Sequence, residues 1–575
     1  MYNDAFIESR HDVFSLSKNN YHENILAMLA TMFDGLCDMI SKYLDEWENE
    51  HPENTEEFKK ASELFINDLS DKRDVSIFLD LIARWLLKNE VITFGIEYFY
   101  IDRDFRDSYY LHYSEKHKEI DRYCKRVFVF IGNHTETLSK IKLSSEELLE
   151  LQKCFAGTIV ATPLPGRGIG RTLLNPIFFF DEEKAYIRKT EYTVHYKGYE
   201  FKVTAFPFRM QDNITTTCAE ITIANTLDYY SMKYNGYQYM VPSDIHQIVK
   251  QERYERHIPS QGIPYQLISR VFYLSGFAPK LYYSSQLSDV SIKHLISYYV
   301  ESGIPVSIGA VDCDKKKNLG HSIVVIGHGE VNKNLSLVSF EQTPTLNRRY
   351  INSADLYSNW IVQDDQHVPY SLYNHIGETG IKRASIFLDN NDKSPKRKEI
   401  TFVVAPLYKR MYMDAIRAQN TILTILDSDD ENYSPYTKCK EDTIIFRLFL
   451  ASSRHLKAFR ISKITDLTLC QLYQETPLPQ FIWVCELYRP DGYKRAKAFG
   501  EIVLDATYSG PNLMESCLMI NYPDRHLAHF FNGASMFQFK AEENENKMIY
   551  EEAVSWVKFD GPDEFDGYTN LSNKS

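Results

Sequence analysis

The sequence lacks the features that define several common classes of protein. Its nine cysteines are scattered, odd in number and without a CxxC pair, which argues against a disulfide framework and against a thiolate zinc site. No stretch approaches the roughly 18 apolar residues that a membrane-spanning helix needs. The segment MYNDAFIESRHDVF has no basic region followed by an apolar run, as a secretory signal would. We therefore expect a cytoplasmic protein that does not enter a membrane.

Basic charge is also scarce. The formal net charge is -13, and residues of both signs are interspersed along the chain. Because contacts with phosphate backbones need concentrated basic surface, nucleic acid is not expected as a main partner. The glycine-rich stretch PLPGRGIGRT at 163–172 has neither the GK[ST] ending of a phosphate-binding loop nor the spacing of a dinucleotide fingerprint. We expect a turn there, and no cofactor.

The sequence does contain enough apolar and aromatic residues for several hydrophobic cores. Its 575 residues exceed several-fold the roughly 100 to 200 residues of a typical domain. Apolar residues follow helical spacing over 20–48, and aromatic and β-branched runs begin at residue 91. A polar stretch at 389–399 could serve as a linker. We expect an α+β protein with a helical N-terminal region at 1–90, a mixed α/β accessory region at 91–195, a core at 196–390 and a mixed α/β C-terminal region at 391–575.

One cysteine, Cys218, stands at the expected start of a helix. Three threonines, Thr215 to Thr217, precede it as candidate N-caps, and the helical spacing of apolar residues continues after it. The thiolate is the reactive form of cysteine, and a helix N-terminus or a neighbouring imidazole favours that form. Position alone favours a buried structural cysteine, because most free cysteines are inert. A nucleophilic role therefore depends on partners elsewhere in the chain.

Candidate partners follow the cysteine in sequence. His321 opens the phrase GHSIVVIG, where the flanking glycine permits close approach and the expected strand would hold the imidazole as a general base. His328, at the exit of the same strand, is the competing base, and we prefer His321. Asp364 and Asp365 follow the apolar run NWIVQ, and a carboxylate at a strand end could orient the base. The doublet by itself is typical of a solvated turn.

Gln211 lies seven residues before Cys218, in an expected loop that leads into the helix. Its amide could donate a hydrogen bond to an oxyanion, with the backbone N–H of Cys218 as the second donor. The alternative is a surface glutamine beside Asp212, which would cap the loop. His526 and His529 could share one helical face, but no HExxH pattern accompanies them, and we assign no metal.

The order of these residues resembles the papain-like cysteine peptidase fold, and most closely its bacterial C39-like branch. The phrases PFRMQD, TCAEITIAN, SGIPVSIG, GHSIVVIGH and VQDDQHVPY carry the resemblance, which spans about residues 200–370. It implies that the region 196–390 is a papain-like core. It also implies the roles of the site residues: Gln211 as oxyanion donor, Cys218 as nucleophile, His321 as base and Asp364 as its orienter, with Asp365 as the alternative orienter.

The sequence departs from the family pattern at two points. Ala-Glu follows the nucleophile in place of the usual glycine, and 43 residues separate His321 from Asp364. We expect the insertion containing TPTLNRRYINSADLY to loop out between strands.

The resemblance implies a thiol protease that hydrolyses a peptide or isopeptide bond of a protein or peptide substrate through an acyl-enzyme. Acyl transfer to an amine, as in transglutaminases, and a non-enzymatic binding role on the same scaffold stay open as alternatives. The flanking regions could shape the cleft or bind a regulatory partner, and the oligomeric state is open.

Overall fold

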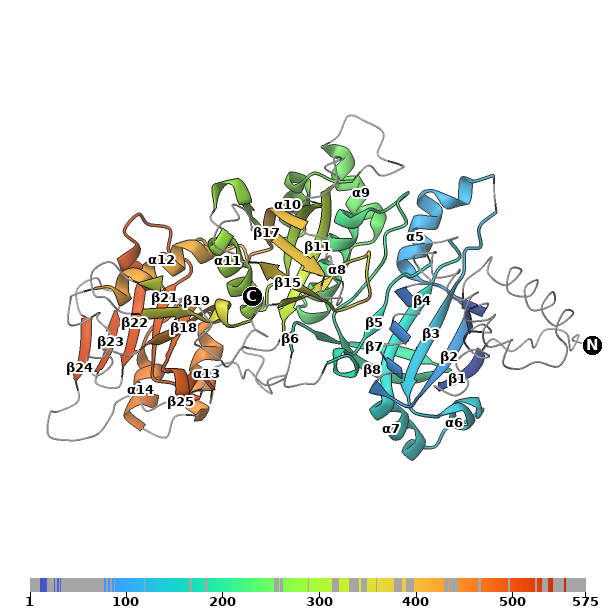
Figure 1. Cartoon of the computed structure of the whole chain (residues 1–575), viewed down its shortest axis with the longest axis horizontal. Helices are drawn as coiled ribbons and strands as arrows, with labels where there is room; N and C mark the ends of the chain where they lie inside the picture. Colours follow the sequence, from blue (N-terminus) through green and yellow to red (C-terminus); the bar gives the residue numbers. More distant parts are fainter. Residues whose placement is uncertain are drawn as a thin grey trace, which may run out of the picture. The chain divides into compact units, whose positions relative to one another are not determined.

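The computed structural model describes most of the chain between residues 89 and 529 (Figure 1). It also describes residues 11–17, 536–540 and 553–554, and twelve positions between 25 and 88. Those positions are helical, and the rest of the predicted helical face at 20–48 lies outside the described residues. The gaps between 89 and 529 are 118, 165–167, 181–184, 253–257, 259–261, 288, 313–319, 330–340, 343–348, 358, 377–384, 389–397, 429–432, 434–442, 464–466, 495–496 and 523–524.

The chain packs into two compact units, and each combines helices with sheets. The predicted α+β class is therefore confirmed, while the four region boundaries and the papain-like nature of the core stay predictions. The first unit comprises Met1–Asp181, Lys189–Val271 and Gln363–Ser371, and the second comprises Glu182–Arg188, Phe272–Val362 and Leu372–Ser575.

An antiparallel five-stranded sheet forms the base of the first unit. Its strands follow chain order, β1-β2-β3-β4-β5, and β1 is a strand within the region where we expected helices. Side-chain caps explain where two helices begin. Asp102 accepts a hydrogen bond from the Phe105 N–H at the start of α5, and Ser144 and Glu147 form a capping box at α7. The elements are β1 (His11–Ser17), β2 (Val91–Tyr100), α5 (Arg103–Leu111), β3 (Cys124–Ile131), α6 (Thr135–Ser139), α7 (Ser145–Cys154), β4 (Phe155–Ala161) and β5 (Leu173–Leu174).

A β-hairpin and two helices complete the first unit. Lys197 and Gly198 join the hairpin strands with φ angles of 50° and 84°, the two-residue turn that matches the twist of the strands. The inner face of the hairpin packs against the sheet, with Phe201 in one core with Phe128. The elements are β7 (Thr190–Tyr196), β8 (Tyr199–Ala205), α8 (Cys218–Lys233) and α9 (Pro242–Gln251), and α10 (Tyr265–Leu274) crosses the boundary to the second unit.

The second unit contains two eight-stranded sheets. The first has the order β10-β11-β14-β15-β16-β17-β9, with β6 paired to β11 and a further pairing of β10 with β17. Every residue of β11 from Ser322 to His328 is buried, which matches its continuous apolar run. The strands are β6 (Tyr186–Ile187), β9 (Lys280–Tyr283), β10 (Val306–Asp312), β11 (Gly320–His328), β14 (Asn359–Gln363), β15 (Ser371–Ile376), β16 (Ser385–Leu388) and β17 (Lys398–Ala405).

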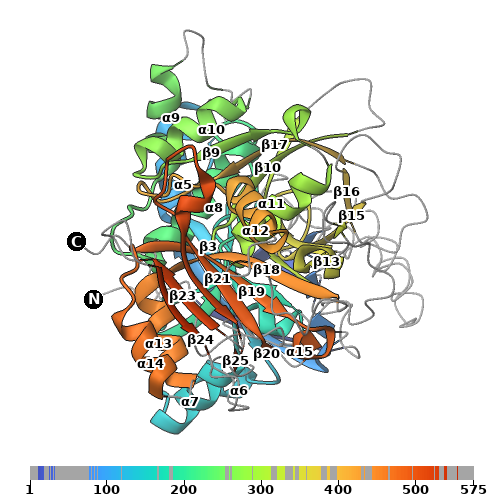
Figure 2. The ribbon, with the colours of Figure 1, turned by 90° about the vertical axis from the view of Figure 1, so that its left-hand side faces the viewer.

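The other sheet has the order β12-β13-β18-β19-β21-β22-β23-β24, and only the β13–β18 pair is parallel. β18 and β19 are buried at every position, and α11 and α13 both pack on β18. Figure 2 shows α13 and α14 beside this sheet. The strands are β12 (Glu341–Gln342), β13 (Arg349–Asn352), β18 (Ile444–Ser452), β19 (Phe481–Tyr488), β21 (Gly500–Asp505), β22 (Cys517–Tyr522), β23 (Arg525–His529) and β24 (Met536–Lys540). The helices are α11 (Asp289–Glu301), α12 (Ala415–Leu426), α13 (Ser453–Lys463), α14 (Leu467–Glu475) and α15 (Pro490–Lys494), and β20 (Lys497–Ala498) pairs with β25 (Ala553–Val554).

The insertion between His321 and Asp364 is not a simple loop, which corrects our expectation. Its segment β13 pairs with β18, and the 3-10 helix η7 (Ser353–Leu356) follows directly. Tyr350 is buried and donates a hydrogen bond to the Leu426 carbonyl at 2.8 Å. Because its apolar side chains are buried, this segment belongs to the fold of the second unit.

Two further expectations concern local structure. His526 and His529 lie on the strand β23, where residues three apart point to opposite faces, so the predicted shared helical face is wrong. Across the described ranges, no helix combines the length and apolar character that crossing a bilayer requires.

Candidate active site

Cys218 is the first residue of α8, as predicted. Its N-cap residue Thr217 is extended, with φ -117° and ψ 178°. The Glu220 carboxylate accepts hydrogen bonds from the Thr217 N–H at 2.9 Å and from the Thr217 hydroxyl. Every residue from Ala219 to Tyr230 is buried, whereas Cys218 itself is half-buried. The helix is thus held firmly while its first side chain remains accessible.

The loop that leads into α8 is organised by Asp212. One carboxylate oxygen accepts hydrogen bonds from the N–H groups of Ile214, Thr215 and Thr216 at 2.9, 2.8 and 2.7 Å. The capping role that we considered for Asp212 is therefore confirmed. Gln211, immediately before it, is buried. A buried amide in a hydrogen-bonded loop suits an oxyanion donor, and that role stays a prediction.

Four of the five other described cysteines differ from Cys218 in their surroundings, and the fifth, Cys470, is half-buried as Cys218 is. Cys124, Cys485 and Cys517 are buried, and burial raises the pKa of each thiol, to about 12 for Cys517. Burial also raises the pKa of the half-buried Cys154. A raised pKa disfavours the reactive thiolate. These four cysteines are therefore poor nucleophiles.

His321 lies near the start of β11, as predicted, opposite Ala310 of β10. β14 is the next strand of the same sheet, and Asp364 and Asp365 follow its last residue directly, in the connection to β15. Both carboxylates are buried, and Asp364 accepts a hydrogen bond from the Gln366 N–H at 2.8 Å. Both acids therefore stand at a strand end, in a turn that is buried and not solvated as the doublet suggested.

The ring nitrogens of His321 and the carboxylates of Asp364 and Asp365 converge. One ligand atom from each residue lies within 4.8 Å of the other two. Either carboxylate could orient the imidazole, so the choice between Asp364 and Asp365 stays open. The same three residues offer one nitrogen and carboxylate oxygens, a donor set that could also hold a divalent metal. The expected absence of a metal therefore stays a prediction.

His328, the competing base, is fully engaged in the core. Its Nδ1 lies 2.9 Å from the Gly329 carbonyl oxygen, and its Nε2 lies 3.0 Å from Oε1 of Glu301. Its ring stacks on Tyr357, with 4.1 Å between ring centroids and 9° between planes. Because both nitrogens already have partners and the ring is buried, His328 is unsuited to proton exchange with a substrate. This supports the choice of His321.

The structure brings together some of the predicted residues. His321 and the two aspartates form one cluster, and Gln211 and Cys218 lie at the two ends of the loop that Asp212 organises. The approach of Cys218 to His321 stays a prediction.

Sequence reasoning missed a cavity of about 60 Å³ in the first unit. Its lining includes Thr216, Glu220 and Ile221, which lie on either side of Cys218 along the chain. Two buried or partly buried arginines also line it. Arg171 belongs to the glycine-rich stretch that we read as a turn, and Arg209 lies two residues before Gln211. In the sequence, the charged residues close to Gln211 and Cys218 were the signal that could have indicated this cavity.

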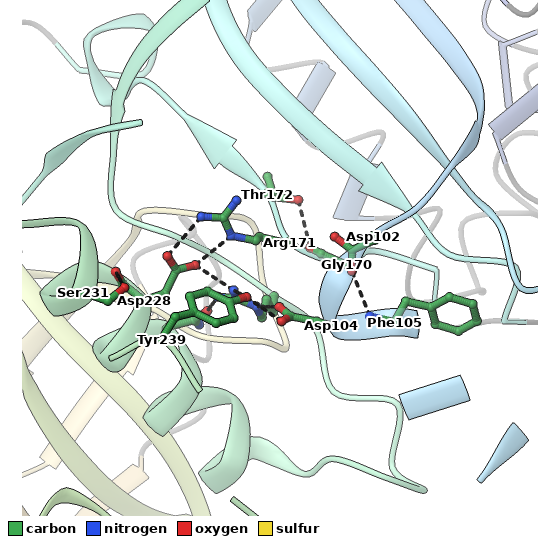
Figure 3. A network of polar contacts seen from close by, with 11 residues as sticks. Asp102, Asp104, Phe105, Gly170, Arg171, Thr172, Asp228, Ser231 and Tyr239 are labelled. Atoms are coloured by element: carbon green, nitrogen blue, oxygen red, sulfur yellow. Dashed lines mark hydrogen bonds and ion pairs between the residues drawn. The ribbon is translucent and has the colours of Figure 1, made fainter. Parts of the chain in front are cut away.

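Both arginines belong to one polar network, in which Figure 3 labels Arg171 and its partner Asp228. The Arg209 side chain lies 2.6 Å from carboxylate oxygens of both Asp104 and Asp228. Arg171 binds both oxygens of Asp228, at 2.8 and 3.0 Å. Burial alone would raise the pKa of Asp228, but the two guanidinium groups outweigh burial and lower it. The paired charges connect α8 to the segment before β5, which carries Arg171, and to the segment after β8, which carries Arg209.

No family model matches the chain, and a search of curated proteins found no significant match.

Proposed function

We propose that the chain is a thiol hydrolase, a cysteine peptidase that cleaves a peptide or isopeptide bond. The observation that carries the proposal is the convergence of His321 with Asp364 and Asp365, which are distant from it in sequence. A half-buried cysteine at a helix N-terminus supplies the nucleophile that such a pair would serve. The proposal places the enzyme in the cytoplasm, with a protein or peptide as substrate.

The proposed reaction has two halves. The Cys218 sulfur attacks the carbonyl carbon while His321 takes or has already taken the thiol proton, and the C–N bond breaks as His321 gives that proton to the leaving amine. Water then attacks the thioester while His321 accepts a proton from it, the C–S bond breaks to release the acid product, and His321 returns that proton to the Cys218 sulfur. One of the two aspartates orients and balances the imidazolium, and Gln211 donates to the oxyanion.

Mapping of thiol labelling tests the proposal. The full chain is treated with iodoacetamide near neutral pH, and the modified cysteines are identified by mass spectrometry. We expect labelling at Cys218 to be at least about tenfold faster than at the buried cysteines, because only the thiolate reacts. His321→Ala should slow labelling at Cys218, and His328→Ala should not, once folding is verified by circular dichroism.

Cys154→Ala is the matched control, because Cys154 is also half-buried but has a raised pKa. This variant should keep the labelling rate of Cys218. Preferential labelling elsewhere, with Cys218 silent, would contradict the proposal. Peptide turnover that requires an added amine would instead favour acyl transfer.

A further inference from the structure

Asp102 is a buried carboxylate in the wall of the cavity beside α8. Its side chain caps α5 through Oδ1, which accepts the Phe105 N–H at 2.9 Å. It is 4% exposed. Within the described ranges, no salt bridge reaches it, although two arginines line the same cavity. Arg209 and Arg171 act on Asp102 only through their charges and form no direct ion pair with it. A buried carboxylate without a direct cationic partner is costly and gains from a cation that binds against it.

The two arginines of the cavity form their ion pairs with other carboxylates. Arg209 bonds to Asp104 and Asp228, and Arg171 binds Asp228 through two hydrogen bonds. Asp212 and Glu220 add two more carboxylates to the lining. Negative charge is therefore in excess around the cavity. Burial and the charge of Asp104 outweigh the Phe105 N–H and the charges of Arg209 and Arg171, and they raise the pKa of Asp102 to about 6.

Size and apolar lining limit what the cavity can hold. At about 60 Å³ it is less than half of the roughly 150 Å³ cavity that accommodates benzene. Apolar residues, among them Ile169, Met210, Ile221 and Ile245, surround the charged wall. This combination suits the end of a flexible side chain, with methylenes against the apolar residues and a charged head against the carboxylate.

We propose that this cavity binds the ammonium or guanidinium end of a lysine or arginine side chain of the polypeptide substrate. The inference rests on the proposed function, because it names the substrate class of that site. Asp102 receives the cationic head. Since the cavity wall borders the first turn of α8, the bound side chain belongs to a residue close to the bond that Cys218 attacks.

Binding to the full-length Cys218→Ala chain tests this inference without requiring any reaction. The probes are Nα-acetyl-lysine methylamide and its norleucine analogue, followed by NMR titration at pH 7.5. We expect the lysine probe to bind at least about tenfold more tightly than the norleucine probe. Asp102→Asn should remove this preference. Asp107→Asn, on the same helix but outside the cavity, should retain it.

Equal binding of the two probes, or a preference that survives Asp102→Asn, would overturn the inference. Binding of n-butylammonium as tight as that of the lysine probe would also overturn the inference, because the site would then bind free amines and not a polypeptide side chain. If Asp102→Asn does not fold, photo-crosslinking of the unmodified chain shows whether the lysine probe binds in the cavity. A diazirine analogue of the lysine probe should attach to cavity residues such as Met210 or Ile245, and attachment elsewhere alone would contradict the assignment.

The two proposals fail separately. If iodoacetamide did not label Cys218, the proposed thiol hydrolase activity would be overturned, and the preference for the lysine probe could still be measured. Loss of the cation preference with Cys218 still reactive would overturn only the substrate class.

Discussion

Glu301, at the end of α11, links His328 to a chain of buried charges. One of its carboxylate oxygens lies 3.0 Å from His328, and the other pairs with Arg447. Arg447 pairs in turn with Glu486, which pairs with Arg460 at 2.9 Å. Buried pairs of this kind do not guarantee stability, but removing one member leaves an uncompensated charge. At the residue scale, this network explains why His328 is structural.

Acid stability should therefore depend on Glu301. Burial alone would raise its pKa, but Arg447 and His328 outweigh burial and hold the pKa at about 2, below the ordinary 4.5. Because the folded-state pKa is depressed, the stabilisation is present above about pH 4.5 and is lost as the pH falls toward 2. Its size is about 3 kcal/mol. Glu301→Gln should lower the free energy of unfolding by this order at pH 6 and by much less at pH 3, measured by urea denaturation.

Glu147→Gln is the control for this pH dependence. Lys140 and the Ser144 N–H also lower the pKa of Glu147 to about 2, but its carboxylate is exposed to solvent. Solvent screens such a pair, and glutamine preserves the capping box. The free energy of unfolding of this variant should equal that of the wild type at both pH 6 and pH 3. An equal effect of both substitutions would show that the buried network is not the cause.

At the scale of elements, two glycines of the first unit occupy left-handed backbone for different reasons. Gly157, in β4, has φ +134°, and a Cβ there would lie 1.9 Å from the Leu173 carbonyl oxygen of β5. Gly198, in the hairpin turn, has φ +84° with nothing within 4 Å of a Cβ. Of these two positions, only 157 requires glycine because two strands pack closely there.

The two substitutions should separate conformational strain from steric overlap. Gly198→Ala should cost roughly 1 kcal/mol, because only the left-handed conformation is penalised. Gly157→Ala adds a collision with backbone and should cost about 3 kcal/mol or more. Thermal unfolding of the full chain, with both variants beside wild type, measures the difference. Similar melting temperatures for the two variants would contradict the packing role of Gly157.

At the scale of the whole molecule, the second unit extends across the predicted boundary between the core and the C-terminal region. β17 begins at Lys398 and pairs with β10, β16 and β9. β13, which precedes Asp364 in sequence, pairs with β18 of the C-terminal sheet. β11, which carries His321, pairs with β10, and β10 also pairs with β17, which lies beyond residue 390.

A chain ending at residue 390 should consequently fail to fold cooperatively. It would lose β17 and β18 and would leave the edges of β10 and β13 unpaired. Near-ultraviolet circular dichroism and thermal unfolding should show no fixed tertiary structure, whereas a control chain ending at residue 554 should unfold like the full chain. A cooperative transition in the 1–390 chain would support the predicted boundary.

The local features of the candidate site follow from the sequence. Threonine caps and helical spacing placed Cys218 at a helix start, and the apolar runs placed His321 and Asp364 at strand ends. These features depend on backbone preferences and side-chain periodicity over a few residues, which any segment carries with it. The roles in catalysis came from a family resemblance and stay proposals.

Other features were decided only by tertiary structure. The convergence of His321 with the two aspartates, the parallel pairing of β13 with β18 and the charged cavity at Asp102 each join segments far apart in the chain. Strand register and the packing of helices on sheets determine which distant side chains meet. Buried charges are stable only beside the partners that this packing supplies, so a sequence can display the arginines and acids without revealing their pairing.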